Sequence, residues 1–272
     1  MKKVLFTSRQ IKQMFGVELV NMPSFRKSFY RYMPLSRVLP MLQKQELTFA
    51  SPALWADPYE QYFLETDYSA FGYIQPKIYC ACFRNDQLNE EASWYMYTKG
   101  KEPTIKVTFD VGLLLRSLYQ RTQLLNIDMY LSKVVYLSTD DIQSITSNPM
   151  MYHQYFDKFN ERQYVRLMSL KRTSFAYENE RRLFLFPRNQ DDLSKSCISI
   201  PFDIRAIQAF SIAPQQAFIS GEDTLTNEKC YNDKCTQIIH QIKPIIDVPI
   251  RRSRLYTKIE PIKQIIPITK SY

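Results

Sequence analysis

Two glutamates and two arginines stand together ahead of an apolar run in the stretch 175–186. Leu and Phe residues in the second half of this stretch predict a buried strand. On a strand, side chains at i and i+2 point to the same face, so Glu178 and Glu180 are expected side by side. Two such carboxylates cost free energy unless cations or hydrogen-bond donors meet them. Arg181 and Arg182 could serve, which would make an ion-paired strand end; a ligand's hydroxyl groups are the alternative.

A second group of candidates combines aromatic and acidic side chains. Trp55 lies two residues before the turn signal Asp57-Pro58, and aromatic rings beside acids in a loop suit ligand contact. Trp94 and Tyr97 are three positions apart in a short helix predicted over 90–97, so their rings would share one side. Packing alone is the competing explanation for these rings.

The composition argues against several classes of protein. The chain has 272 residues, of which 45% are hydrophobic and 23% charged, a balance typical of globular proteins. With only 5 glycines it contains neither G-x-G-x-x-G nor G-x-x-x-x-G-K-[ST], so Rossmann and P-loop chemistry is not expected. The net charge of +9 favours an anionic partner such as nucleic acid, a dinucleotide or an acidic protein.

The five cysteines stand at positions 80, 82, 197, 230 and 235. Neither close pair has the C-x2-C spacing of a zinc ribbon, so no metal is expected. The sequence shows no secretory segment and no run of about 18 apolar residues. We therefore expect free thiols in a reduced, cytoplasmic protein that does not use a membrane.

Hydrophobic periodicity predicts many short strands, several of them ended by proline, with few regular strand–helix alternations. This pattern predicts an α+β fold with mostly antiparallel pairing: split sheets that face one another across a cleft, with peripheral helices. We expect one domain over 1–272, with strands and a helix in 191–272 completing the fold. Besides the stretch at 175–186, strands are predicted at 29–33, 47–52, 77–83, 104–109, 133–137, 197–202, 207–213 and 245–250, and helices at 35–42, 90–97, 111–125, 144–172 and 232–242.

Several short motifs follow one another along the chain: Tyr30-Arg31-Tyr32, Phe49-Ala50-Ser51-Pro52, Asp57-Pro58-Tyr59-Glu60, Cys82-Phe83-Arg84, Trp94 with Tyr97, and Tyr177-Glu178-Asn179-Glu180-Arg181-Arg182. Their order and spacing resemble a bacterial family known as domain of unknown function 2971, over about residues 28–190. The sequence departs from the family pattern at Ala56, where Asn is usual, and at Arg84, where Ser is usual.

A more distant resemblance is to ADP-ribosyltransferases, which carry an early Arg or His, a middle Ser, Thr or Tyr, and a late Glu-x-Glu. Arg31, Ser51 and the pair Glu178 and Glu180 stand in that order. The resemblance implies NAD as substrate, with Glu180 stabilising an oxocarbenium-like transition state and Arg31 anchoring the diphosphate or its ribose. It also implies an aromatic clamp on nicotinamide, for which Tyr97, Trp94 and Trp55 are candidates.

This resemblance predicts an NAD-dependent transferase, such as a toxin or phage-defence effector, with RNA, DNA or protein as acceptor and an antitoxin protein as a conceivable partner. Five residues far apart in sequence should then converge on one pocket. They are Arg31, Ser51, Trp94, Tyr97 and Glu180, with Trp55 and Asp57 as further candidates for contact with NAD.

Two other functions remain open from the sequence. In a metal-dependent nuclease, Asp57, Glu178 and Glu180 would hold Mg²⁺ and Lys171 would assist. In a non-catalytic binding module, Tyr and Trp rings together with Arg and Lys would contact nucleic acid or a partner protein.

Overall fold

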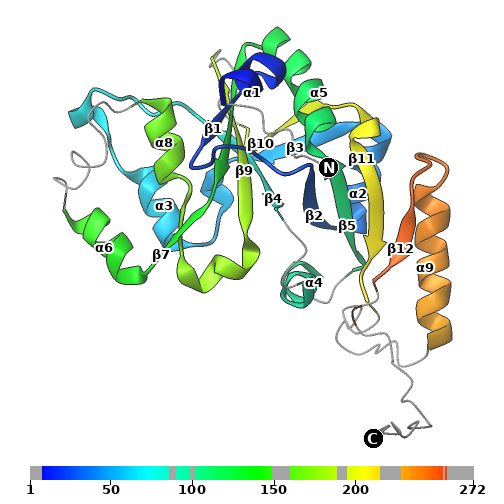
Figure 1. Ribbon diagram of the computed structural model, residues 1–272. Helices are drawn as coiled ribbons and strands as arrows, with labels where there is room; N and C mark the ends of the chain where they lie inside the picture. Colours follow the sequence, from blue (N-terminus) through cyan, green and yellow to red (C-terminus); the bar gives the residue numbers. More distant parts are fainter. Residues whose placement is uncertain are drawn as a thin grey trace, which may run out of the picture.

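A computed structural model of the chain describes residues 8–85, 90–98, 102–148, 160–188, 195–214, 228–253 and 255. Its main feature is a ten-stranded sheet (Figure 1). The strands of this sheet are β1 (Val17–Val20), β2 (Ser28–Pro34), β3 (Glu46–Ala50), β4 (Tyr79–Arg84), β5 (Thr104–Asp110), β6 (Ile127–Lys133), β9 (Glu180–Pro187), β10 (Cys197–Pro201), β11 (Ile207–Ile212) and β12 (Ile250–Arg252).

Most neighbouring strands in the sheet are antiparallel. The main path runs β1-β6-β9-β4-β2-β5-β11-β12, and only the outermost pairs, β1 with β6 and β11 with β12, are parallel. A separate parallel pair joins β7 (Val135–Leu137) to β8 (Leu170–Arg172). The predicted α+β class with mainly antiparallel pairing is thus confirmed, but one continuous sheet takes the place of the two facing sheets.

The sheet forks at β4. Along one edge β4 pairs with β9 over its whole length, from Tyr79 to Arg84. Its other edge is shared: Arg84 pairs with Tyr30 of β2, whereas Cys80 pairs with Ala50 of β3. Strands β2 and β3 therefore leave β4 at opposite ends, and a gap opens between them.

Helix α2 (Leu35–Lys44) connects the two branches of this fork. It follows Pro34 of β2 directly and ends at Gln45, whose φ of 53° reverses the chain into β3. The sequence predicts an apolar stripe at Leu35, Val38, Leu39 and Leu42. Val38 and Leu42 are buried together with Met41, whereas Leu35 and Leu39 are half-buried.

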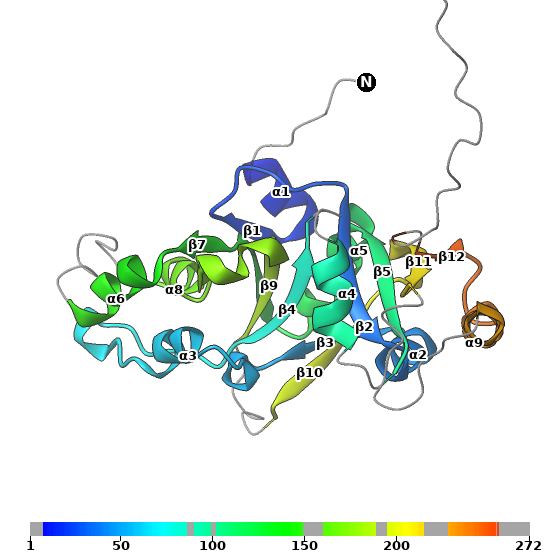
Figure 2. The ribbon, with the colours of Figure 1, turned by 90° about the horizontal axis from the view of Figure 1, so that it is seen from below.

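The other helices cover the sheet on both sides and at both ends (Figures 1 and 2). Figure 1 shows α3, α6 and α8 near one end of the sheet and α9 beside β12 at the other. In Figure 2, α4 lies across β2 and β4. The remaining helices are α1 (Ser8–Phe15), α3 (Pro58–Glu65), α4 (Glu90–Thr98), α5 (Val111–Leu124), α6 (Thr139–Ser147), α8 (Glu161–Leu167) and α9 (Glu228–Ile242), with short 3-10 turns η1 (Pro52–Leu54), η2 (Ser69–Phe71), η3 (Thr173–Glu178) and η4 (Ile204–Ala206).

Two hydrophobic clusters meet the alternating side chains of the central strands. On β9, Leu183 and Leu185 belong to the larger cluster, whereas Phe184 and Phe186 belong to the smaller one. The smaller cluster also contains Phe63 of α3. Because both faces of β9 are covered, the run that follows Arg182 is apolar throughout, as a strand buried on both sides requires.

Several predicted elements differ from the structure. The strand at 245–250 is wrong except at Ile250, and the predicted helix 144–172 covers the end of α6, helix α8 and strand β8. Residues 149–159 of that predicted helix lie outside the described residues. Strand β1 and helix α1 were not predicted, because the first residues show no clear period. Within the described ranges, no helix is both long and apolar enough to cross a membrane.

Candidate functional site

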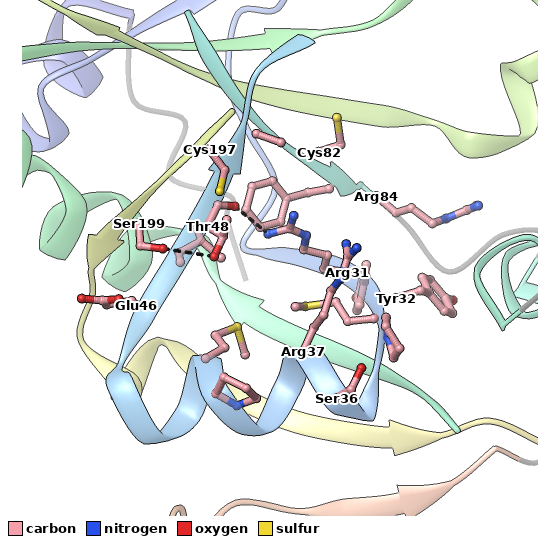
Figure 3. A pocket seen from close by; sticks show the side chains of 18 of the residues that line it. Arg31, Tyr32, Ser36, Arg37, Glu46, Thr48, Cys82, Arg84, Cys197 and Ser199 are labelled. Carbon is pink, nitrogen blue, oxygen red and sulfur yellow. Dashed lines mark hydrogen bonds between the residues drawn. The ribbon is translucent and has the colours of Figure 1, made fainter. Parts of the chain in front are cut away.

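A cavity of about 810 Å³ occupies the gap between β2 and β3 (Figure 3). Residues of β2, α2, β3, β4 and β10 form its wall, and Glu180 at the start of β9 completes it. The fork of the sheet explains the cavity, since no strand lies between β2 and β3 to fill that space with side chains.

The wall of the cavity is predominantly basic. Four of its residues carry positive charge, namely Arg31, Arg37, Lys44 and Arg84, and two carry negative charge, Glu46 and Glu180. Hydroxyl groups of Ser36, Thr48 and Ser199 and the thiols of Cys82 and Cys197 add further polar contacts. Such a wall is suited to an anionic ligand that also presents hydroxyl groups.

Arg31 reaches the cavity from the middle of β2. Its guanidinium lies 5.8 Å from the centre of the Phe83 ring, and its Nη1 lies 3.5 Å from the carbonyl oxygen of Thr48. The side chain therefore spans the gap from β2 towards β3, as Figure 3 shows. The planar guanidinium of Arg31 carries several N–H donors, and in this position it suits a phosphate or diphosphate group.

Glu180 is one of three residues that pair with one another across strands β2, β4 and β9. Tyr30 of β2 pairs with Arg84 of β4, which in turn pairs with Glu180 of β9. Side chains of directly paired residues lie on the same face of a sheet. Tyr30, Arg84 and Glu180 all line the cavity, so the register itself brings this carboxylate to the wall.

The Glu180 carboxylate is held mainly by Arg182. Arg182 is 1% exposed and donates from Nε at 3.0 Å and from Nη2 at 2.9 Å to Glu180 Oε2. Its remaining donors reach the carboxylate of Glu60 and, at 2.7 Å, the carbonyl oxygen of Met168. The guanidinium of Arg182 is thus held by Glu60 and by Met168, and it holds Glu180 in position in turn.

Glu178 lies next to Glu180 for a different reason from the one predicted. Glu178 ends η3 rather than lying on the strand, and Asn179 turns the chain with a left-handed φ of 43°. Asn adopts this conformation more readily than most residues. Lys171 of β8 then contacts both carboxylates, with its Nζ 2.5 Å from Glu178 Oε2 and 3.5 Å from Glu180 Oε1. The pair is ion-paired, but it is buried rather than on the surface.

The two carboxyl groups titrate differently. Burial alone would raise the pKa of Glu180, but the charges of Arg182 and Lys171 outweigh it, so that its pKa is lowered and the group is ionised at neutral pH. Burial and the nearby charge of Glu180 raise the pKa of Glu178 to about 7, despite Lys171. One ionised carboxylate thus lies beside a carboxyl group that can exchange a proton near neutrality.

The loop candidates lie close to this network but not in the cavity wall. Ser51 caps η1 by accepting from the amide of Ala53 at 3.3 Å, and Asp57 caps α3 and forms a 3.2 Å ion pair with Arg172. The ring of Trp55 covers the Arg182 guanidinium at 4.1 Å. Among the residues predicted to converge, Arg31 and Glu180 line the cavity, whereas Ser51 does not. The further candidates Trp55 and Asp57 do not line it either, and they contact Arg182 and Arg172 instead.

The aromatic candidates on α4 are Trp94 and Tyr97. Trp94 is fully buried and meets Tyr32 edge to face, with ring centres 4.8 Å apart. Tyr32 itself lines the cavity, so Trp94 supports a ring of the wall from behind. Tyr97 belongs to α4, and its side chain lies outside the described residues.

Several residues of the site were not selected from the sequence. Arg37 and Lys44 lie on α2, and their charges at i and i+7 were a usable signal, since two helical turns separate them. Glu60, the second partner of Arg182, was visible only as part of the Asp-Pro-Tyr-Glu motif. Its role depends on a tertiary contact between α3 and β9, which no local pattern reveals.

No group of three or more His, Cys, Asp or Glu side chains within the described ranges has a geometry that could hold a metal ion. Of the acids considered for Mg²⁺, Asp57 pairs with Arg172, while Glu178 and Glu180 share Lys171. Cys80 and Cys82 lie on β4 with their sulfur atoms 4.0 Å apart, and Cys235 is buried on α9.

Two of three comparisons with known proteins find no match, and the third finds a weak likeness. No protein-family model matches the chain, so the resemblance to domain of unknown function 2971 is not confirmed. No curated protein matches either. Among solved structures, the chain has a likeness to DarT of Thermus sp. 2.9 in complex with NAD+, at 8% identity and a TM-score of 0.35, over 85% of this chain and 98% of that one. A TM-score of this size does not establish that two chains share a fold.

Proposed function

We propose that the protein is an NAD-dependent ADP-ribosyltransferase whose NAD site is the cavity between β2 and β3. One observation carries this proposal: Arg31 and Glu180, to which the resemblance to ADP-ribosyltransferases assigns the roles of diphosphate anchor and catalytic carboxylate, line the same cavity. A wall with four basic side chains and the ionised carboxylate of Glu180 suits a ligand that has a diphosphate at one part and a cationic glycosidic centre at another.

In the proposed reaction, the bond between C1′ of the ribose and the nicotinamide nitrogen breaks. Its electron pair leaves with neutral nicotinamide, and the positive charge that develops on the ribose is stabilised by the carboxylate of Glu180. Arg182 and Lys171 keep that carboxylate ionised and in place. A nucleophile of the acceptor then bonds to C1′, and its proton passes to the pair of glutamates, of which Glu180 lines the cavity and Glu178 behind it has a pKa of about 7.

The remaining candidates receive supporting roles in this proposal. Arg31 binds the diphosphate, and Arg37, Lys44 and Arg84 add positive charge along the wall. Tyr32, with Trp94 packed behind it, supplies a fixed aromatic surface against which a planar ring can lie. Trp55 covers Arg182 and so acts on Glu180 through that arginine rather than on NAD directly, and Asp57 holds Arg172.

The acceptor belongs to the same proposal. The net charge of +9 and the basic cavity favour an acceptor with phosphates, RNA or DNA, because such a molecule would be steered towards the site. A cytoplasmic toxin or phage-defence effector, neutralised by an antitoxin protein, is the cellular role that fits this chemistry.

A second candidate is a non-catalytic module that binds an anionic ligand in the same cavity. The observation in its favour is that both oxygens of Glu180 contact cations, Oε1 with Lys171 and Oε2 with Arg182, as they would in a purely structural ion-pair network. Such a module would bind a dinucleotide without changing it.

The two candidates differ in their products. The purified protein is incubated with NAD+ labelled in the nicotinamide ring, and both free nicotinamide and bound NAD+ are measured. Nicotinamide release that rises with protein concentration supports the transferase. Binding of NAD+ with no release above the protein-free rate supports the binding module, and absence of binding contradicts both.

A further inference from the structure

Lys171 is placed between the two glutamates rather than in the cavity. Its ammonium group contacts Glu178 and Glu180 at 2.5 and 3.5 Å, and the side chain is 9% exposed. The ring of Phe175 lies 4.9 Å from the same nitrogen. Lys171 does not line the cavity, so its contacts are with the glutamates and not with a ligand.

The position of Lys171 follows from the small parallel pair beside the main sheet. Strand β8 pairs Lys171 with Tyr136 of β7, and the hydroxyl of Tyr136 accepts a 3.0 Å hydrogen bond from the amide of Glu180. Strand β7, strand β8 and the first residue of β9 are thus linked by hydrogen bonds. This link fixes the lysine relative to both carboxylates through the backbone, not through flexible side chains alone.

We infer that Lys171 is a positioning residue of the proposed transferase: through its contacts with both carboxylates it aligns Glu180 with the cavity and couples Glu180 to Glu178. The inference rests on the proposed function, and it assigns to Lys171 neither contact with NAD nor a covalent step. A lysine is suited to this task because one compact ammonium group can contact two separate carboxylates at once.

The charged and titratable groups around Glu178 and Glu180 determine whether the loss of Lys171 raises or lowers the pKa values of these two residues. Lys171 and Arg182 favour ionised carboxylates, whereas Glu60 adds negative charge and competes for Arg182. Loss of Lys171 should therefore raise the apparent pKa values of the pair, by about 1 unit or more. The groups that face the pair are Glu60 on α3, Cys80 and Cys82 on β4, Tyr136 on β7, Lys171 on β8, Tyr177 on η3 and Arg182 on β9.

Four variants test the inference. Lys171→Met removes the charge at similar length, and Lys171→Arg keeps it. Lys133→Met is the matched control, because Lys133 is exposed at the end of β6. Lys171→Met alone leaves two buried carboxylates with one cation fewer and is liable to unfold. The double variant Lys171→Met with Glu178→Gln removes one charge of each sign and provides a folded alternative.

Two readouts separate a positioning role from a structural one. The first is the release of nicotinamide as a function of pH and of NAD+ concentration. We expect Lys171→Met to lower kcat about tenfold or more with KM within about twofold, and to move the acidic limb of kcat upward by about 1 pH unit. Lys171→Arg should restore most of kcat, and Lys133→Met should match the wild type; the double variant is read only by the titration of Glu180 described next.

The second readout needs no activity: the carboxyl ¹³C resonances of Glu178 and Glu180 are titrated, with Glu→Gln variants for assignment. Their midpoints should rise in Lys171→Met, and that of Glu180 should rise in the double variant. Unchanged midpoints, or a loss of activity that merely follows the folded fraction, would overturn the inference. Shifted midpoints in a protein that releases no nicotinamide would support the coupling and contradict the proposed function instead.

Discussion

Arg31 and Glu180 belong to opposite faces of the same sheet and nevertheless line one cavity. Glu180 follows the face of Tyr30 and Arg84, its partners in register, whereas Arg31 is the next residue after Tyr30 and lies over Phe83. The pleat would separate these side chains in an intact sheet. Both side chains line one cavity because the sheet is open between β2 and β3, and the cavity occupies that opening.

The role of Arg31 predicts a loss of binding without a loss of stability. Arg31→Ala should weaken NAD+ binding by about tenfold or more, because a charge-assisted contact with the diphosphate disappears. Titration calorimetry measures the affinity. Arg205→Ala is the matched control, since Arg205 is exposed and pairs only locally with Asp203. Equal affinities for Arg31→Ala and the wild type would remove Arg31 from the site.

The burial of Arg182 predicts a large loss of stability. Arg182→Met leaves Glu60 and Glu180 buried without their shared cation, which should lower the free energy of unfolding by about 3–5 kcal/mol. Arg188→Met, at an exposed pair with Asp128, should cost about 1 kcal/mol or less. Urea denaturation of both variants makes the comparison. Similar losses for the two would show that the ion pairs behind the cavity are not effectively buried.

The raised pKa of Glu178 predicts how stability depends on pH. The neutral carboxyl is favoured in the folded state, so its contribution is complete below about pH 4.5 and is lost as the pH rises through about 7. The free energy of unfolding should fall between pH 5 and pH 8, by about 1–3 kcal/mol. Glu180, whose pKa is lowered, loses its contribution only at more acidic pH.

Glu178→Gln isolates this contribution. The variant cannot ionise at this position, so its stability should fall less than that of the wild type between pH 5 and pH 8. Glu65→Gln, at an exposed glutamate, should retain the wild-type fall. If Glu178→Gln and the wild type lose the same free energy over this range, Glu178 does not titrate there.

Cys197 gives a direct probe of occupancy. Its thiol is exposed and lines the cavity, whereas the exposed thiol of Cys230 lies on α9 beside the opposite end of the sheet. NAD+ should slow the reaction of Cys197 with a maleimide about tenfold at saturation and leave Cys230 unaffected. Mass spectrometry of the labelled peptides measures both rates. Protection of neither thiol would place NAD+ elsewhere. Equal protection of both thiols would indicate a general conformational change.

The sequence predicts local elements of the fold better than it predicts their pairing. Strands β2, β3, β4, β5, β9, β10 and β11 were predicted because each has an apolar run or an alternation of its own. Strands β1 and β8 are short and pair in parallel with β6 and β7, so their existence depends on residues far along the chain. The fork of the sheet at β4 also depends on non-local contacts, since it arises because β2 and β3 pair with opposite ends of β4.

For the site, the sequence identified the pair of glutamates but not what holds it. A strand pleat was expected to align Glu178 with Glu180, whereas the left-handed turn at Asn179 and the shared Lys171 do so. Arg84 appeared only as a departure from a family pattern, yet it is the direct partner of Glu180 in register. Register between strands cannot be derived from one strand alone, which is why this neighbour was missed.

The most direct test of the proposed function is the rate of nicotinamide release by Glu180→Gln at saturating NAD+, compared with the wild type and with Glu46→Gln, the other carboxylate of the cavity wall. Glutamine keeps the size of Glu180 but removes the charge that stabilises the developing cation. We predict a fall in kcat of about a hundredfold or more for Glu180→Gln, with little change in NAD+ affinity, and near wild-type release for Glu46→Gln. Wild-type turnover by folded Glu180→Gln would contradict the assignment of Glu180 as the catalytic carboxylate.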